Sequence, residues 1–371
     1  MDPTGDGPLV AVLGGGQLGR MLGLAGLPLG IRFRFLDPSP AAPARALGRL
    51  VVGELGDEHA LDEVASGATV VTYEWEGVPA DGARRAGQHA AVLPEPRALE
   101  VAQDRLVEKE TFCRVGIDVA PFAAVDSHTD LGRAVAELGL PAVVKTRRGG
   151  YDGKGQHLIR ERADVDAAWS TLGGVPLIVE TIVPFSRELS VLAVRAKDGP
   201  TRCYPLVENR HRSGILHVSR APAPGMTTEL QGAGEAIATR LLDQLEYVGV
   251  IAIELFEHDG RLLANEMAPR VHNSGHWTIE GAETSQFENH LRAILGWPLG
   301  STTPRGHMAM VNCLGSMPGR RRILAIEGAH LHDYEKEPRP ARKVGHVTVT
   351  AADEATRDER LARVLSVVGP T

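Results

Sequence analysis

The segment AVVKTRRGGYDGKGQ, residues 142–156, carries the strongest signal for the fold. Its first residues are apolar and predict a short strand that ends at Lys145. The ten residues after Thr146 contain four glycines and three cationic side chains. Glycines allow a backbone to lie close to a bulky anion, and cations neutralise its charge. No G-K-[ST] sequence opens a helix here, so the pattern is not a Walker loop. We therefore expect a glycine-rich flap over phosphates, with a solvated hairpin tip as the alternative.

A second glycine loop lies near the N-terminus. Gly14, Gly16 and Gly19 follow an apolar run and satisfy the pattern G-x-G-x-x-G, and Asp37 ends the next apolar run. Taken alone, this arrangement predicts a dinucleotide site in a nicotinamide-dependent oxidoreductase. Such a loop offers backbone N–H groups and a helix N-terminus to any anion or polar ligand. It therefore indicates the architecture more than the ligand, and a tight turn without a ligand is a further alternative.

The order of apolar runs predicts an α/β protein of three parts. Strand-length runs separated by helix-length segments indicate a parallel sheet. These runs are residues 9–13, 31–36 and 69–72. We expect a Rossmann-like parallel-sheet domain over residues 1–112, a small α+β lid over residues 113–183, and a C-terminal α+β domain over residues 184–371 that holds the metal and substrate sites.

Composition and charge narrow the class of protein. A chain of 371 residues exceeds the usual size of a single core, so several domains are expected. The formal net charge of −7 argues against nucleic acid as a partner. Cys113, Cys203 and Cys313 are odd in number and far apart, which favours reduced thiols and a cytoplasmic location. No apolar run approaches the length of a membrane span, so no membrane partner is expected.

Two acidic residues predict a metal site. Glu254 lies in an apolar run, where an unpaired carboxylate is costly, and Glu266 lies on the returning strand. A three-residue hairpin loop at residues 258–260 would make Glu266 the diagonal neighbour of Glu254 on one sheet face, about 7–8 Å away at the backbone. A two-residue Asp-Gly turn would place Glu266 on the opposite face. Converging carboxylates require a cation, and Mg²⁺ shared with nucleotide phosphates suits such ligands.

Two further clusters could bind small anions. Arg270, His272 and Asn273 follow the second glutamate directly, and together they could cradle a small oxyanion. A basic cluster nearer the C-terminus could receive a phosphate monoester, although such clusters are often only solvated surface. Its members are Lys336, Arg339, Arg342 and Lys343.

Taken together, these segments resemble the ATP-grasp superfamily and, within it, the family of N5-carboxyaminoimidazole ribonucleotide synthetases of purine biosynthesis. The resemblance spans nearly the whole chain in family order. Its most specific segment is APRVHNSGHW from Ala268. The other matching segments are GGGQLGRM from Gly14, TYEWEGVP from Thr72, RRGGYDGKGQ from Arg147, NRHRSGI from Asn209, the NEM that precedes Ala268, and KEPRPARKVGH from Lys336.

The resemblance implies a role for each matching residue. The residues implied to hold ATP are Arg105, Lys145, Gly150, Tyr151, Asp152, Gly153, Lys154, Gly155, Gln156, Glu180, Thr181, Ile182, Val183, Glu188, His211, Asn265 and Glu266. The residues implied to contact aminoimidazole ribonucleotide are Gln17, Leu18, Glu74, Tyr151, Asp152, Lys154, Lys336, Arg339, Arg342 and Lys343. Arg270, His272 and Asn273 would position bicarbonate, and Lys154 would join them as a catalytic residue. Glu254 and Glu266 would bind Mg²⁺, with Mn²⁺ possible.

The resemblance also implies a reaction and an assembly. Bicarbonate would attack the γ-phosphoryl group of ATP to give carboxyphosphate, which would carboxylate aminoimidazole ribonucleotide, and the enzyme would be a homodimer. A formate-dependent glycinamide ribonucleotide transformylase is the nearest rival. The nicotinamide-dependent oxidoreductase remains the rival from another class, and it leaves the paired glutamates and the flap unexplained.

Overall fold

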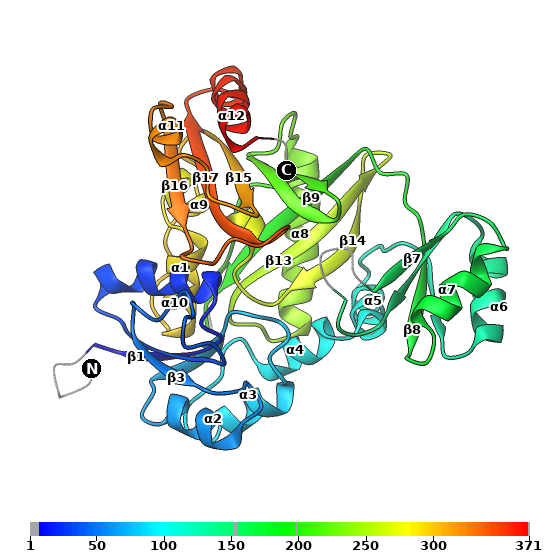
Figure 1. The fold of residues 1–371 in the computed structure, drawn as a ribbon, viewed down its shortest axis with the longest axis horizontal. Helices are drawn as coiled ribbons and strands as arrows, with labels where there is room; N and C mark the ends of the chain where they lie inside the picture. The colour runs from blue at the N-terminus through cyan, green and yellow to red at the C-terminus, as the bar shows by residue number, and fades with distance from the viewer. Residues whose placement is uncertain (1–6, 151–154, 198, 370–371) are drawn as a thin grey trace.

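Three β-sheets organise the chain in the computed structural model, which describes residues 7–150, 155–197 and 199–369. Figure 1 shows the N-terminal sheet at the lower left, a large sheet through the centre, and a small sheet with two helices that projects to the right. This mixed α/β architecture, with a parallel N-terminal sheet and two antiparallel sheets, agrees with the ATP-grasp fold that the resemblance implies. The domain limits expected at residues 112 and 183 remain a prediction.

The N-terminal sheet is parallel, as the spaced apolar runs predict. Its strand order is β3-β2-β1-β4, and β3 was not expected from the sequence. Both faces of β1 are covered, since Val10 and Val12 join one buried cluster and Ala11 and Leu13 another. Burial on both faces explains the continuous apolar run. The elements are β1 (Leu9–Leu13), α1 (Gln17–Gly26), η1 (Leu27–Leu29), β2 (Arg32–Asp37), β3 (Arg49–Val52), α2 (Glu58–Ala65), β4 (Val70–Tyr73), α3 (Ala80–Ala86), α4 (Pro96–Ala102) and α5 (Arg105–Arg114).

The small sheet is antiparallel and carries the glycine-rich segment between two of its strands. Its order is β5-β8-β6-β7. Two helices bury Leu131, Val135 and Ala168 against it, which leaves its other face toward the large sheet. The elements are β5 (Phe122–Val125), α6 (His128–Leu138), β6 (Ala142–Thr146), β7 (Gln156–Ile159), α7 (Asp164–Leu172) and β8 (Leu177–Thr181).

The large sheet runs β14-β13-β9-β11-β12-β15-β17-β16, with β10 paired to β9. Its strands are β9 (Arg187–Arg195), β10 (Thr201–Cys203), β11 (Val207–Arg212), β12 (Ile215–Ala221), β13 (Gly249–His258), β14 (Arg261–Ala268), β15 (His307–Leu314), β16 (Ala329–Asp333) and β17 (Lys343–Ala351). The associated helices are α8 (Thr228–Gln244), η2 (Asn273–Gly275), α9 (Thr278–Gly281), α10 (Gln286–Ile294), α11 (Arg320–Leu324) and α12 (Glu354–Val368).

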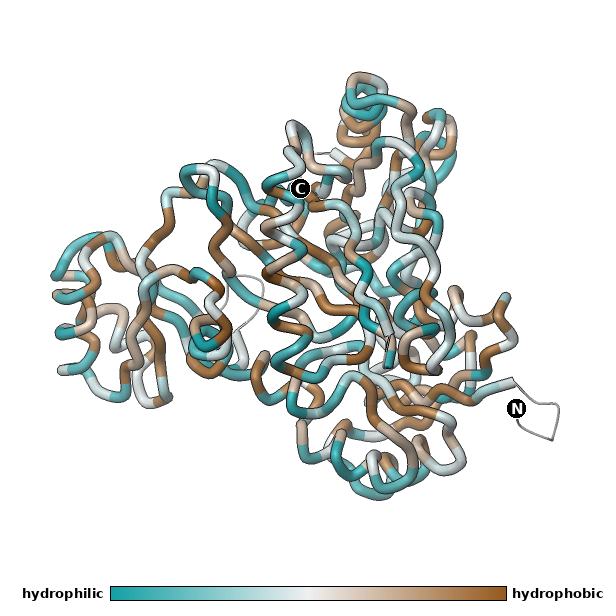
Figure 2. The backbone as a smooth tube through the Cα atoms, turned by 180° about the vertical axis from the view of Figure 1, so that it is seen from behind, coloured by the Kyte–Doolittle hydropathy of each residue, from teal (hydrophilic) through white to brown (hydrophobic). Residues whose placement is uncertain are grey.

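One face of the large sheet is covered by α8. Figure 2, from behind, shows apolar and polar residues alternating along this helix. Leu230, Ile237 and Leu241 lie on its buried side, and the helix packs onto β9 and β14. The opposite face of those strands is therefore left to line a site. In the described part of the chain, no helix is long and apolar enough to cross a membrane.

Candidate active site

A cleft of about 1340 Å³ lies between the three sheets and contains most of the residues implied by the resemblance. Its lining includes Gln17, Leu18, Glu74, Arg105, Lys145, Gly150, Gln156, Glu180, Thr181, Ile182, Val183, Glu188, His211, Glu254, Asn265, Glu266, Arg270, His272, Asn273, Lys336 and Lys343. Gly155, Arg339 and Arg342 are not among the lining residues. Tyr151, Asp152, Gly153 and Lys154 lie outside the described residues.

The hairpin between the two glutamates has a different turn from the one expected. His258 pairs with Arg261, so the turn contains two residues, and the predicted three-residue loop is wrong. Asp259 and Gly260 have φ values of 50° and 73°. Positive φ at both central residues defines the turn favoured by Asp-Gly in hairpins, because its twist matches that of the strands. This turn alone would place Glu266 on the opposite face from Glu254.

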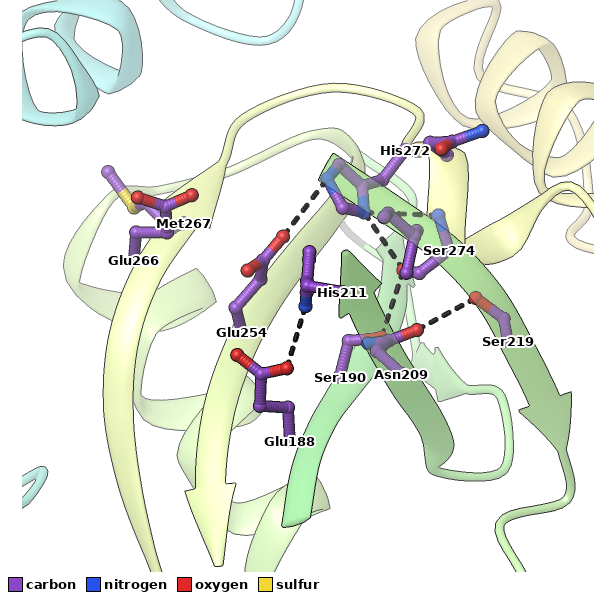
Figure 3. Close-up of polar contacts among 12 residues, drawn as sticks. Glu188, Ser190, Asn209, His211, Ser219, Glu254, Glu266, Met267, His272 and Ser274 are labelled. Carbon is purple, nitrogen blue, oxygen red and sulfur yellow. Dashed lines mark hydrogen bonds and ion pairs between the residues drawn. The ribbon is translucent and has the colours of Figure 1, made fainter. Parts of the chain in front are cut away.

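A β-bulge at Asn265 restores the pairing of the two glutamates. The register shifts between Glu254 and Leu255, so Leu255 pairs with Ala264 and Glu254 pairs directly with Glu266. The one extra residue in β14 reverses the alternation of its side chains. The two glutamates are therefore direct cross-strand neighbours on the cleft face (Figure 3), whereas the sequence predicted a diagonal pair.

The electrostatics of this pair fit a divalent cation. Burial and the neighbouring Glu266 carboxylate raise the pKa of Glu254 to about 7. Burial also opposes ionisation of Glu266, but Arg105, whose Nη1 lies 3.0 Å from Oε2, outweighs it and holds the pKa of Glu266 below its ordinary value. Carboxylate oxygens are the ligands that Mg²⁺ prefers. The described residues contain no group of three or more metal-binding side chains, so nucleotide phosphates would complete the coordination.

The strand lysine of the flap is held by Glu180. Lys145 Nζ lies 3.0 Å from Glu180 Oε1, and Lys109 Nζ lies 3.3 Å from Oε2. Lys109 is buried and also donates to the Ala264 carbonyl at 3.5 Å. Sequence reasoning missed Lys109, although it lies four residues after Arg105 and therefore on the same side of α5. Both oxygens of Glu180 thus contact lysines, and this carboxylate positions the cation at the end of β6.

The other end of the cleft is apolar. Phe185 stacks on Phe256 with ring centroids 4.7 Å apart, and Ile182 and Phe185 are both exposed. Beside this pair, His211 Nδ1 lies 2.7 Å from Glu188 Oε2. Burial lowers the pKa of His211, but the hydrogen bond to Glu188 outweighs it and the pKa is raised. The two phenylalanines were missed because they lie in segments that also read as ordinary core.

The expected oxyanion cluster is present on the cleft wall. Arg270 is partly buried and forms an ion pair with Glu76. His272 Nε2 lies 3.4 Å from Glu254 Oε1, and burial, followed by the Arg270 charge, lowers the pKa of His272 well below its ordinary value. Asn273 exchanges two hydrogen bonds with Asn312, at 3.1 and 2.6 Å. The structure therefore brings these side chains beside the carboxylate pair, and it adds Glu76 as the partner of Arg270.

The N-terminal glycine loop is filled by carboxylates of the chain itself. Glu74 accepts hydrogen bonds from the backbone N–H groups of Gly16, Leu18 and Gly19 at 2.8, 3.1 and 3.1 Å. A Cβ atom on Gly16 would lie 2.5 Å from a Glu74 oxygen, which explains the glycine. Asp37 accepts from the N–H of Gly15 at 2.9 Å. The N–H groups that would bind a pyrophosphate are thus already paired, which argues against a dinucleotide at this loop.

Only the two lysines of the basic cluster near the C-terminus line the cleft, and its two arginines do not. Lys336 Nζ donates to Gln17 Oε1 at 2.5 Å, and Lys343 lines the same part of the cleft. Arg339 is exposed, and Arg342 Nη1 donates to the Glu337 carbonyl at 3.3 Å. Burial lowers the pKa of Lys336 to about 8. Two lysines therefore lie beside Gln17 and Glu74, and the two arginines lie on the outer part of the loop.

Comparison with known protein families agrees with this fold and this cleft. Residues 9–103 match the ribonucleotide synthetase preATP-grasp domain, residues 110–287 match the ATP-grasp domain, and residues 308–360 match the phosphoribosylaminoimidazole carboxylase C-terminal domain. The class of protein is thus an ATP-grasp ligase.

Individual relatives narrow the class to one family. The chain is 51% identical over 359 residues to N5-carboxyaminoimidazole ribonucleotide synthase of Pseudomonas aeruginosa, covering 97% of this chain and 99% of that protein. It belongs to the N5-carboxyaminoimidazole ribonucleotide synthase family. The crystal structure of the synthetase from Thermus thermophilus is similar, with 55% identity, a TM-score of 0.94 and coverage of 98% of this chain and 99% of that one.

A fungal relative was solved with ligands. The synthase from Aspergillus clavatus, in complex with ADP and 5-aminoimidazole ribonucleotide, is 30% identical with a TM-score of 0.91, and the match covers 98% of this chain and 99% of that one.

Proposed function

We propose that the chain catalyses ATP-dependent carboxylation of 5-aminoimidazole ribonucleotide by bicarbonate, giving N5-carboxyaminoimidazole ribonucleotide, ADP and phosphate in purine biosynthesis. The observation that carries this proposal is the direct pairing of Glu254 with Glu266 in a cleft that also holds Lys145. A facing carboxylate pair, a lysine and the base of a glycine-rich flap are the parts needed to activate a nucleotide triphosphate. The names of the relatives supply the acceptor.

The reaction proceeds in two steps. A bicarbonate oxygen attacks the γ-phosphorus of ATP, the bond from that phosphorus to the β–γ bridging oxygen breaks, and ADP leaves with the bonding electrons. The exocyclic amine of the ribonucleotide then attacks the carboxyl carbon of carboxyphosphate, or CO₂ released from it. With carboxyphosphate, the bond from carbon to the phosphate oxygen breaks, inorganic phosphate leaves, and the amine nitrogen loses a proton.

Different residues of the cleft wall would bind the metal, the phosphates of ATP and the bicarbonate. Glu254 and Glu266 would hold Mg²⁺, or Mn²⁺ in its place. When bound, the cation neutralises charge on the phosphates. Lys145, held by Glu180, lies where it can contact the phosphates and supply a fixed positive charge. Arg270 and His272, on the other side of Glu254, would orient the bicarbonate.

The acceptor ribonucleotide would lie at the N-terminal end of the cleft. Lys336 and Lys343 would bind its phosphate there, with Gln17, Leu18 and Glu74 beside it. The stacked pair Phe185 and Phe256 offers an apolar surface for the nucleotide base at the opposite end. ATP and the acceptor would then approach the carboxylate pair from opposite ends. A homodimeric assembly and a cytoplasmic location are also part of the proposal.

Phosphate release tests the proposal. With MgATP and bicarbonate, addition of 5-aminoimidazole ribonucleotide should stimulate phosphate release. No stimulation by the ribonucleotide would overturn the proposal. The same assay with formate in place of bicarbonate and glycinamide ribonucleotide as the acceptor distinguishes the proposed reaction from that of the formate-dependent transformylase. Binding of NADH in preference to ATP would favour the oxidoreductase.

A further inference from the structure

A row of buried polar side chains, joined by hydrogen bonds, crosses the large sheet and ends at His272; it is called the hydrogen-bond chain below. Figure 3 shows it crossing from β12 through β11 and β9 to the segment after β14. Ser219, Asn209, Ser190 and Ser274 are its members, and each is at most 4% exposed. None of these four carries a charge. Buried polar groups normally satisfy one another, so the order of donors and acceptors along such a chain is informative.

The imidazole end of the chain fixes where the proton of His272 lies. The backbone N–H of Ser274 donates to His272 Nδ1 at 3.3 Å, and the Ser274 hydroxyl lies 2.8 Å from the same atom. A backbone N–H can only donate, so Nδ1 is an acceptor and carries no proton. The ring is therefore the neutral tautomer with its proton on Nε2. That nitrogen points at Glu254 Oε1, 3.4 Å away.

The remaining hydrogen bonds run in the same direction. The Ser219 hydroxyl donates to Asn209 Oδ1 at 2.8 Å, and Asn209 Nδ2 donates to Ser190 Oγ at 3.0 Å. The Ser190 hydroxyl then donates to Ser274 Oγ at 2.9 Å. Since His272 Nδ1 carries no proton, its contact with Ser274 Oγ requires the Ser274 hydroxyl to donate. Every donor thus points toward the imidazole.

The strand register explains why these residues meet. Ser190 pairs with Glu254 across β9 and β13, and Asn209 pairs with Ser219 across β11 and β12. Paired residues of neighbouring antiparallel strands share a face. The chain is thus built into the same sheet face that carries the two glutamates, and it does not depend on a mobile surface group.

We propose that this hydrogen-bond chain locks His272 as an Nε2–H donor, so that His272 stabilises the oxyanion of bicarbonate and carboxyphosphate and does not act as a general base. Ser190, Asn209, Ser219 and Ser274 are positioning residues, because they act through the imidazole. The inference rests on the proposed function for the identity of the oxyanion. The tautomer itself does not depend on that function.

Nitrogen NMR of the whole protein tests the tautomer directly. Long-range ¹H–¹⁵N correlation spectra of histidine-labelled protein distinguish a protonated from an unprotonated ring nitrogen, and the His272 signals are assigned by their loss in His272→Gln. We expect His272 to be neutral with its proton on Nε2. A proton on Nδ1 would overturn the inference. If the wild-type protein instead shows this tautomer but no ribonucleotide-stimulated phosphate release, the proposed function fails and the tautomer stands.

Kinetics of two sets of variants test the role. Ser190→Ala breaks the chain and should lower kcat by about 10- to 100-fold, as for other residues that orient an active-site ligand, with the KM for ATP unchanged. Thr348→Val is the matched control. Thr348 is buried on the same sheet, and within the described residues its hydroxyl has no hydrogen-bond partner. Equal kcat values for the Ser190→Ala variant and the wild type would contradict the proposed role of the hydrogen-bond chain in positioning His272.

His272→Gln and His272→Ala separate a donor from a base. Glutamine can donate a hydrogen bond but cannot take up a proton at neutral pH. We expect His272→Gln to retain at least tenfold more activity than His272→Ala, a difference of about 1.4 kcal/mol in barrier. Equal inactivity of the two variants would indicate a general base and would overturn the proposal.

Discussion

Two regions of this protein place carboxylates next to the same cleft, and they do so with opposite results. In the N-terminal loop, Glu74 accepts three backbone hydrogen bonds, so its oxygens are satisfied by the fold itself, although burial outweighs these bonds and raises its pKa. On the large sheet, Glu254 and Glu266 face each other, and Arg105 compensates only the second. A carboxylate whose partners belong to the fold stabilises the structure, whereas a facing pair of carboxylates stabilises a bound cation.

The largest effect is expected on the sheet. Glu266→Gln removes a carboxylate that is proposed to hold the metal and that also pairs with Arg105. Turnover should fall by roughly 100-fold or more, which corresponds to about 2.7 kcal/mol or more in barrier. Ribonucleotide-stimulated phosphate release measures it. Glu359→Gln, the same change at an exposed position on α12, is the control and should leave turnover unchanged. Wild-type turnover in the Glu266→Gln variant would contradict the proposed role of Glu266 in binding the metal.

A Glu-to-Gln substitution in the N-terminal glycine loop should instead change the stability of the fold. Glu74→Gln places an amide group where three backbone N–H donors converge, so one donor faces another. Loss of charged hydrogen bonds at a buried site should reduce the free energy of unfolding by roughly 2–3 kcal/mol. Chemical denaturation followed by circular dichroism measures the change. An unchanged unfolding midpoint would show that the loop does not depend on this carboxylate.

Lys336 should make binding of the ribonucleotide sensitive to pH. Burial lowers the pKa of this ammonium group to about 8, so it loses its charge as the pH rises above that value. The KM for the ribonucleotide should then rise, by at most about tenfold per pH unit, while the KM for ATP stays constant. Lys336→Arg should abolish the rise because a guanidinium group stays charged. A flat KM between pH 7 and 9 in the wild type would contradict this role.

The smallest effect is expected for Glu254→Gln in the absence of metal. The folded-state pKa of about 7 exceeds the ordinary value, so the contribution of this carboxyl to stability is present at low pH and is lost as the pH rises through about 7. Glutamine avoids that loss and should stabilise the protein by roughly 1 kcal/mol at pH 8. Denaturation with a chelator at pH 8 and pH 5 measures it. A gain of equal size at pH 5 would point to another cause.

Much of the architecture could be predicted from the sequence, because it depends on local patterns. The parallel sheet follows from apolar runs buried on both faces, and α5 begins at Arg105 and is followed by Gly116 at a φ of 69°. The short strand β3 was missed because Arg49–Val52 contains only three apolar residues.

The candidate site was predicted in composition but not in geometry. The pairing of Glu254 with Glu266 depends on a bulge at Asn265, and no turn rule locates a bulge in the middle of a strand. Similarly, the contacts of Lys109 with Glu180 and of Arg270 with Glu76 join residues far apart in the chain. The sequence shows the residue types, but only tertiary packing determines which charges meet.

One turn of α5 joins both halves of the cleft. Arg105 pairs with Glu266, Glu108 accepts the backbone N–H of Met267 at 2.7 Å, and Lys109 contacts Glu180. Truncating any one of these side chains removes a contact between α5 and another wall of the cleft. Double-mutant cycles along this helix should therefore be strongly non-additive, since Glu108 also interacts electrostatically with Arg105 and Lys109. Evolutionary change at these positions should accordingly proceed through paired replacements, because single steps are the most harmful.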